Sequence, residues 1–226
     1  SQNYAISYVG GTLTIKAEAP TSISANMNTL YENRTTGTLA GTLSSTSLSH
    51  FASYTYSLVT GLGSTDNDKF DISGNTIITK NSFDYETQNV FNIRVRSTTQ
   101  YGLFIDQTFV VNLSDVNEVP TINNIADQRI YFQEGVTEYI SLQNVTVGPD
   151  FNQSVQTSIS SSNPSLFRSL NVNNNQITYI INEGQLGTAT LTVTVKDNGG
   201  TANGGVDEIS RSFVLTVDAT PVLTGT

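Results

Sequence analysis

Short runs in which every second residue is apolar recur along most of this chain. The clearest example, residues 91–96, reads FNIRVR. Successive side chains of a β-strand point to opposite faces, so this spacing gives a strand with one buried and one solvated face. Long segments rich in Glu, Lys, Ala and Leu with apolar residues at helical spacing are missing. The pattern therefore predicts an all-β protein built from antiparallel sandwich strands.

The length of 226 residues suits two domains of about 100 residues each. Residues 20–119 are predicted to form seven strands, the clearest of which are Tyr54–Val59, Phe70–Ser73, Thr76–Lys80, Val90–Thr98 and Gln107–Ser114. Residues 120–219 repeat the arrangement. The apolar residues of shared parity there are Ile177, Tyr179, Ile181, Ala189, Leu191, Val193, Val195, Phe213, Leu215 and Val217. We predict two tandem seven-stranded Greek-key β-sandwiches arranged end to end.

The two ends of the chain are predicted to belong to neighbouring repeats. Residues 1–19 hold two short alternating stretches around Gly10-Gly11, which is a hairpin signal. We interpret them as the tail of a preceding repeat, and residues 220–226 as the linker to the next one. The chain is therefore expected to be a segment of a longer protein.

Charge and composition exclude several classes of function. Nineteen acidic residues against ten basic ones give a formal charge of −9, which disfavours nucleic acid as a partner. Cysteine is absent, so the chain has no disulfide, nucleophilic thiol or soft-metal ligand. No apolar run reaches the length of about 18 residues that a membrane helix needs.

Acidic residues gather just beyond the predicted strands at three distant places. These are Glu32, the run Asp84-Tyr85-Glu86 and the run 115–120, which reads DVNEVP. Grouped carboxylates repel one another unless a positive charge lies between them. Ca²⁺ meets this need, because it takes about 6–8 oxygen ligands from carboxylates, amides and carbonyls. We therefore expect a calcium-stiffened joint between the two domains.

Residues 54–120 contain YTYSLVTGLGSTDNDKFDIS, FDYETQNVFNIRVRS and DVNEVP, and this stretch resembles cadherin repeats of the bacterial type. The resemblance implies a set of calcium ligands, which in this chain are Glu32, Asp84, Glu86, Asp115, Asn117 and Glu118. Two positions depart from the family pattern. Tyr85 stands where Arg is common, and Glu118 stands where Asp is usual.

The second domain resembles bacterial Ig-like or cadherin-like repeats through VTVKDNGGTANGGVDE and RSFVLTVD, and residues 1–19 resemble the end of an MBG-type repeat. The topology implied by the resemblance brings the second-to-third and sixth-to-seventh strand loops of the second domain to the joint. Those loops offer Asp150, Asn152 and Asp197 as further ligands. A role in forming turns is the alternative for Asp150 and Asp197, since Asp and Asn suit tight turns.

Other acidic groups are weaker candidates. Glu134, Glu183 and Asp218 are expected to gather at the far end of the second domain, as a weak or incomplete site. The run Asp66-Asn67-Asp68 lacks the Gly and the terminal Glu of an EF-hand loop. We expect it to form a turn ahead of the strand that begins at Phe70.

Catalysis is not expected. His50 is the only histidine and no Gly-x-Ser-x-Gly elbow occurs, so a hydrolase has little support. Tyrosines that could stack on sugar rings are Tyr54, Tyr101, Tyr131 and Tyr139. They keep a carbohydrate-binding module open as the alternative function, although Trp is absent and sandwich strands favour Tyr in any case.

The predicted function is that of a calcium-binding, calcium-rigidified adhesion stalk, part of a large repetitive bacterial surface or secreted protein. The expected partners are calcium ions, with glycans or other surface proteins contacted through the parent protein. We expect the segment to be monomeric, extracellular and not inserted in a membrane.

Overall fold

The computed structural model describes residues 17–48 and 52–221. The hairpin predicted around Gly10-Gly11 and the single histidine, His50, lie outside the described residues. The chain divides into two compact units, Ser1–Asp115 and Val116–Thr226, here called the first and second unit. Regular structure in the described part consists of strands and three single-turn 3₁₀ helices, and no helix there is long and apolar enough to cross a bilayer.

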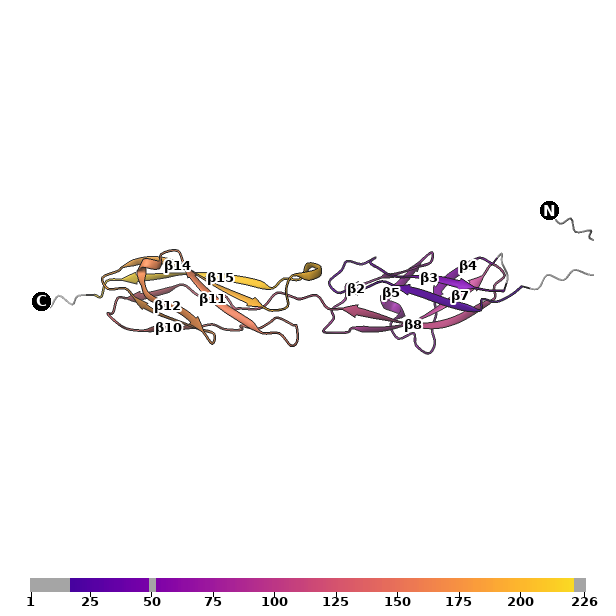
Figure 1. Cartoon of the computed structure of the whole chain (residues 1–226), viewed down its shortest axis with the longest axis horizontal. Coiled ribbons are helices and arrows are strands. Elements are labelled where there is room, and N and C mark those ends of the chain that lie inside the picture. Colours follow the sequence, from indigo (N-terminus) through magenta and orange to yellow (C-terminus); the bar gives the residue numbers. More distant parts are fainter. Residues whose placement is uncertain (1–16, 49–51, 222–226) are drawn as a thin grey trace, which may run out of the picture. The chain divides into compact units, whose positions relative to one another are not determined.

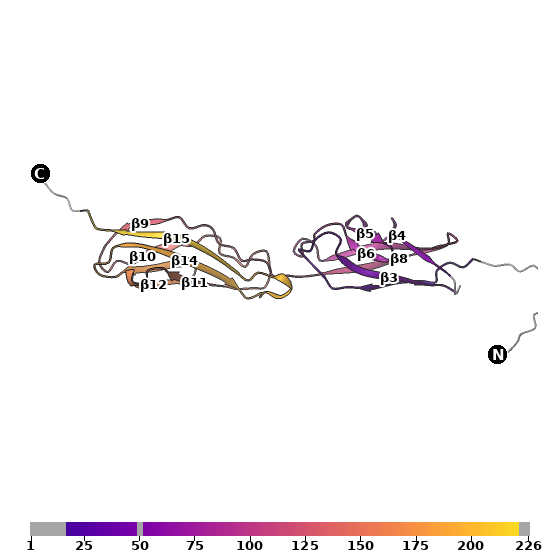
Figure 2. The same cartoon turned by 90° about the horizontal axis from the view of Figure 1, so that it is seen from above.

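The first unit is a sandwich of two sheets (Figures 1 and 2). One sheet has the order β1 (Ser22–Met27), β3 (Leu39–Thr46), β6 (Thr76–Thr79) and β5 (Phe70–Ser73). The other has the order β2 (Leu30–Tyr31), β8 (Phe104–Ser114), β7 (Val90–Thr99) and β4 (Tyr54–Leu58). The first strand crosses between the sheets, because β1 pairs antiparallel with β3 whereas β2 pairs parallel with β8.

The core of the first unit follows the alternation in the sequence. Phe91, Ile93 and Val95 are buried, as predicted, and they point between the sheets. Phe91 packs against Phe70 and Phe83 with ring centroids 5.6 Å and 4.5 Å apart. Burying a side chain of this size contributes about 1.5–3 kcal/mol, so the aromatic group stabilises both sheets.

The described part of the second unit, up to residue 221, repeats the arrangement with seven strands. One sheet has the order β10 (Glu138–Ser141), β13 (Gln176–Ile181) and β12 (Phe167–Asn173). The other has the order β11 (Val155–Ser161), β14 (Gly187–Asp197), β15 (Glu208–Asp218) and β9 (Gln128–Tyr131). Here too the early strand β9 pairs parallel with the last strand, β15. The ten apolar residues predicted to share one parity are all buried.

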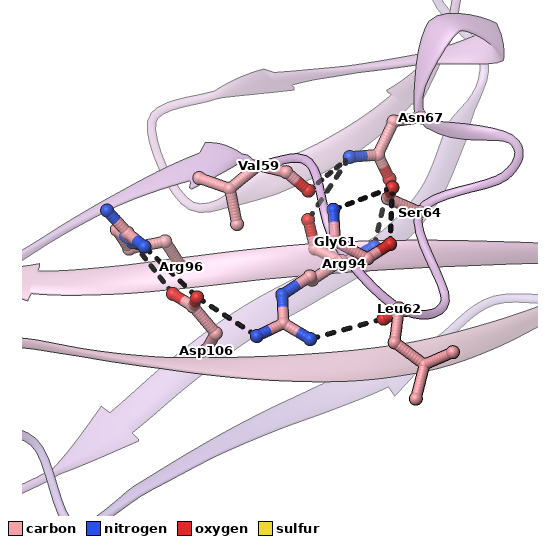
Figure 3. Close-up of polar contacts among 8 residues, drawn as sticks. All are labelled: Val59, Gly61, Leu62, Ser64, Asn67, Arg94, Arg96 and Asp106. Atoms are coloured by element: carbon pink, nitrogen blue, oxygen red, sulfur yellow. Dashed lines mark hydrogen bonds and ion pairs between the residues drawn. The ribbon is translucent and has the colours of Figure 1, made fainter.

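Strand β8 begins three residues earlier than the predicted start at Gln107. Its first residues lack the apolar–polar alternation, because the apolar Ile105 is followed by two polar residues, Asp106 and Gln107. Asp106 is held instead by two cations (Figure 3): it accepts hydrogen bonds from Arg96 Nε at 2.7 Å and from Arg94 Nη2 at 3.2 Å. The hydrogen bond from Arg96, together with that from Arg94, lowers the pKa of Asp106 despite its burial.

Arg94 and Asn67 fasten the 59–67 loop to β7 (Figure 3). The Arg94 guanidinium donates to Leu62 O at 3.1 Å, and the backbone N–H of Arg94 donates to Asn67 Oδ1 at 2.9 Å. Asn67 in turn donates from Nδ2 to Val59 O at 2.9 Å. The loop therefore leads into β5 along a fixed path.

The run Asp66-Asn67-Asp68 forms the predicted turn. Residues Asn67–Lys69 make a 3₁₀ helix that runs directly into β5. Asp66 is buried, and its carboxylate accepts hydrogen bonds from Asn92 N at 2.8 Å, Gln88 Nε2 at 3.0 Å and Lys69 Nζ at 3.0 Å. Burial alone would raise the pKa of Asp66, but these hydrogen bonds outweigh it and lower the pKa to about 2.

Asp66→Asn tests this turn. The pKa of Asp66 is lower in the folded state than its ordinary value of 3.8, so the carboxylate stabilises the fold above about pH 4 and that contribution is lost as the pH falls through about 2. We expect the substitution to lower the free energy of unfolding by about 2 kcal/mol at neutral pH. Urea unfolding at pH 7 and at pH 2 measures the difference, which should shrink at the lower pH. Asp68→Asn, at an exposed position two residues away, is the control, and an equal loss there would contradict the assignment.

Candidate metal centre

Three carboxylates meet at one end of the first unit. Glu32 follows β2, Glu86 lies in the loop between β6 and β7, and Asp115 follows β8. Each offers one oxygen, and these oxygens lie within 4.8 Å of one another. The parallel pairing of β2 with β8 explains why Glu32 and Asp115 meet. The register pairs Tyr31 with Ser114, so the next residue of each strand leaves the sheet at the same edge.

Glu32 joins three segments of the chain at this end. It is 1% exposed, its Oε2 accepts a hydrogen bond from Tyr85 N at 2.7 Å, and its backbone N–H donates to Ser114 O at 3.1 Å. The next residue, Asn33, has a left-handed φ of 56° and donates from its backbone N–H to Phe83 O at 2.9 Å. Glu32 therefore holds the loop that carries Glu86 against the ends of β2 and β8.

The chemistry of this group suits a hard divalent cation. Carboxylates this close raise one another's electrostatic energy, and burial of Glu32 strengthens the effect by removing water. Oxygen ligands at this spacing fit Ca²⁺, which completes its coordination with backbone carbonyls and water. Glu32, Glu86 and Asp115 are the residues of the first unit that could hold the ion.

Asp84 is placed differently from the three acids of the cluster. Its Oδ1 accepts from Thr87 N at 3.0 Å and its Oδ2 accepts from Thr87 Oγ1 at 3.0 Å. Both oxygens therefore cap the turn at residues 84–87, a local role typical of Asp. The neighbouring Glu86 reaches the cluster while Asp84 organises the loop that presents it.

The N-terminal part of the second unit carries a second polar group, centred on Asn117. Its Nδ2 lies 3.1 Å from Asp197 Oδ1, 3.1 Å from Gly200 O and 3.0 Å from Val206 O. Its Oδ1 accepts from Gln153 Nε2 at 2.8 Å. The Asn117 amide is thus a structural clamp inside the second unit, and the oxygen expected to bind metal accepts a hydrogen bond from Gln153.

Asp197 keeps one oxygen available. Its Oδ1 accepts from Gly199 N at 2.9 Å as well as from Asn117, whereas its buried Oδ2 has no hydrogen-bond partner among the described residues. A buried carboxylate oxygen without a partner costs free energy unless an ion or water meets it. Gly199 is required beside it, since a Cβ there would lie 1.8 Å from Asn117 Oδ1.

Asp150 and Asn152 have different surroundings. Asp150 is buried, and its Oδ2 accepts from the backbone N–H of Glu118 at 3.0 Å. Asn152 is exposed and has a left-handed φ of 59°, a backbone geometry found in turns. The structure thus brings Asp150 close to the start of the second unit and places Asn152 in a bend facing solvent.

Asp218 at the end of β15 has a cationic partner. Arg129 Nε donates to Asp218 Oδ2 at 2.5 Å, and this hydrogen bond raises the pKa of Arg129. Glu134 and Glu183 do not join Asp218 in any group of metal-ligating side chains found among the described residues. Arg129 therefore supplies a positive charge at the position where the sequence suggests a weak metal site.

The sequence gives uneven signals for the residues that complete these groups. The Gly-Gly pair after Asp197-Asn198 is a visible signal, because tight approach of backbone to a side chain requires glycine. Gln153 and Arg129 carry no such signal, since single polar residues at strand ends are common. Their partners become apparent only when the loops are folded together.

Comparison with solved structures identifies the fold. The chain is similar to the EC1-2 fragment of human protocadherin-24, with 18% identity over 87% of this chain and 98% of that one and a TM-score of 0.63. It is also similar to EC1-2 of human mucin-like protocadherin, with 16% identity over 88% and 99% of the two chains and a TM-score of 0.50. Domains 3-6 of protocadherin gamma B2 match with 17% identity over 91% and 52% and a TM-score of 0.55.

No protein-family model matches the chain, and no curated protein matches it. At these identities the solved structures establish the fold alone. The chain is all-β and consists of two cadherin-like β-sandwich domains in tandem, as predicted. The acidic cluster of the first unit is consistent with a Ca²⁺ site.

Asn117→Ala tests the clamp in the second unit. The substitution removes four hydrogen-bonding contacts and leaves Gly200 O and Val206 O without their side-chain donor. We therefore expect the free energy of unfolding to fall by about 2 kcal/mol. Urea unfolding should show the same loss in EDTA and in Ca²⁺. Asn112→Ala, at an exposed position on β8, is the control. A loss confined to Ca²⁺ would show instead that the Asn117 amide is a metal ligand.

Asp84→Ala separates turn capping from metal binding. The substitution removes two hydrogen bonds to Thr87, so we expect a loss of about 1 kcal/mol without Ca²⁺, as for other lost caps. Thermal melting in EDTA measures this loss. Thr87→Val, which removes one of the same hydrogen bonds, should reproduce part of it. An Asp84→Ala variant that matches the original chain in EDTA and differs only in Ca²⁺ would assign Asp84 to the metal.

Proposed function

We propose that this chain is a calcium-binding structural segment of an adhesive surface or secreted protein. The observation that carries the proposal is the meeting of Glu32, Glu86 and Asp115, with oxygens within 4.8 Å, at the end of a cadherin-like sandwich. Ca²⁺ at this place neutralises the acids, and its preference for oxygen ligands matches this set of carboxylates. The ion acts as a structural brace, and no reaction is involved.

The second unit supports the proposal with its own ligands. Asp197 presents a buried Oδ2 that has no hydrogen-bond partner among the described residues, and the buried Asp150 accepts a hydrogen bond from the backbone N–H of Glu118. A cation bound by Asp150 and Asp197 would offset the cost of burying both carboxylates. We propose these two as further calcium ligands, while Asn117 and Asn152 serve the structure of the loops.

Chain connectivity relates the two sets of ligands. Asp115 ends the first unit, and Glu118 follows it by three residues, so their Cα atoms are separated by at most about 11 Å. We propose Glu118 as a ligand on this basis. Ca²⁺ bound at Asp115 or at Glu118 would restrict the backbone of the segment 115–118, and its removal would leave repulsion among neighbouring acids to loosen it.

The cellular setting follows from the same picture. Calcium sites with an affinity of about 10⁻⁴–10⁻³ M are filled only outside the cell, where calcium is plentiful. A chain without cysteine gains there a reinforcement that disulfides provide in other secreted domains. We propose an extracellular stalk on a bacterial surface, monomeric in this segment, with adhesion performed by the parent protein.

A calcium titration followed by thermal and urea unfolding tests the proposal. At about 10 mM Ca²⁺ the stabilisation should be about 2 kcal/mol for a site of extracellular affinity. The double variant Glu86→Gln/Asp115→Asn should lose this response. In EDTA it should be at least as stable as the original chain, because two mutually repelling charges are gone.

The control removes the same number of charges elsewhere. Asp71→Asn/Glu134→Gln changes two exposed acids and should keep the full response to Ca²⁺. Equal loss in both double variants would assign the effect to net charge. An original chain whose unfolding is unchanged by Ca²⁺ would reject the calcium proposal.

A further inference from the structure

The outer face of the three-stranded sheet in the second unit carries an ordered set of neutral polar side chains. The register of β10, β13 and β12 aligns Tyr139, Thr178 and Asn171 in one row across the strands. Ser141, Gln176 and Asn173 form the next row. Directly opposed residues share a face, and the intervening residues of β13, such as Ile177 and Tyr179, are buried in the core. Figure 1 labels β10 and β12, the two edge strands of this sheet.

The hairpin that joins β12 to β13 extends this face. Asn174 and Asn175 both have left-handed φ angles, 45° and 58°, which is the geometry of a type I′ turn. The hairpin is fixed to the adjoining strand, since Leu142 N donates to Asn175 O at 2.7 Å. The tip is therefore a rigid platform, in keeping with the preorganisation that favours binding.

The platform is hollowed on both sides of the hairpin. The hollow toward β10 has a volume of about 620 Å³. It is lined by both rows through Ser141, Asn171 and Gln176. A second hollow of 490 Å³ lies toward β11 and is bordered by Gln156 and Thr157. Both are open and polar.

The amides of this face are not used by the fold. Asn171, Asn173, Asn174, Asn175 and Gln176 are all exposed. None of their side chains makes a hydrogen bond to another described residue. Each carboxamide offers two donors and one acceptor, so the face presents many hydrogen-bonding groups of both kinds without a formal charge. On β14 and β15, by contrast, the Thr and Ser hydroxyls are hydrogen-bonded to each other, Thr192 to Ser212 and Thr194 to Ser210.

Tyr139 adds the apolar surface that a neutral amide face otherwise lacks. Tyr139 is 61% exposed and lies at the edge of the row that contains Thr178 and Asn171. A tyrosine ring can stack on an apolar ligand face while its hydroxyl remains hydrated. One aromatic ring beside amides and hydroxyls matches a ligand that has both C–H faces and many hydroxyl groups.

We propose that the outer face of β10, β13 and β12 is a binding site for a neutral polysaccharide. Tyr139 stacks on a sugar ring, while Asn171, Asn173 and Gln176 exchange hydrogen bonds with its hydroxyls. The absence of Lys and Arg from the two rows argues against nucleic acid and acidic glycans, which need cations. The lack of exposed aliphatic anchors in these rows argues against an apolar peptide. The site holds no carboxylate, so it works without Ca²⁺ and is independent of the function proposed above.

Affinity electrophoresis of the whole chain in EDTA tests the site. The gels contain dextran, a soluble β-1,3-glucan, hydroxyethyl cellulose or galactomannan, with polygalacturonate as the acidic comparison. At least one neutral polysaccharide should retard the chain. Tyr139→Ala should weaken that retardation about tenfold, as expected for the loss of one stacking contact. Asn171→Ala/Asn173→Ala should weaken it by a similar factor.

Tyr131→Ala is the matched control, because Tyr131 is an exposed tyrosine of the same unit on β9, in the other sheet. It should leave the retardation unchanged. All variants change exposed residues, and equal melting temperatures verify their folding. The proposal is overturned if no neutral polysaccharide retards the chain, if only polygalacturonate does, or if Tyr139→Ala and Tyr131→Ala behave alike. The calcium response of Tyr139→Ala should equal that of the original chain, which separates this test from the calcium test.

Discussion

The parallel pairing of the first strand with the last is the interaction on which the first unit depends. The short strand β2 leaves the sheet of β1 and pairs with β8, which closes the sandwich along one edge. Continuing the register beyond Tyr31 and Ser114 brings Glu32 beside Asp115. The loop after β6 is then fixed to Glu32 through Tyr85 N, and Glu86 completes the cluster. One backbone pairing thus positions all three acids.

The second unit uses the same pairing with a different outcome. There β9 runs parallel to β15, and the register sets Tyr131 opposite Asp218 and Arg129 opposite Thr216. Tyr131 therefore lies beside Asp218, whereas in the first unit Glu32 lies beside Asp115. Arg129 then reaches Asp218 as a cationic partner. Two sandwiches with one topology thus differ at this end because of two side chains.

The alternation of apolar residues was sufficient to predict the fold class and most of the strands, because a buried face of period two admits few other solutions. The start of β8 was missed, since Asp106 is held by arginines and breaks the alternation. The particular hydrogen-bond partners of Asp84 and Asn117 were also not predicted from the sequence. A resemblance gives the residue type at each position, but Thr87 and Gln153 decide where these two side chains point.

Buried acids in this chain fall into two kinds, and their partners distinguish them. Asp66 is surrounded by Lys69, Gln88 and a backbone N–H, so the fold itself satisfies its charge. Asp197 has no such cation and keeps a buried oxygen that no described residue meets. Natural sequences break the rules of burial chiefly where function requires it. The contrast within one chain therefore assigns Asp66 to the scaffold and supports the proposal that Asp197 is a metal ligand.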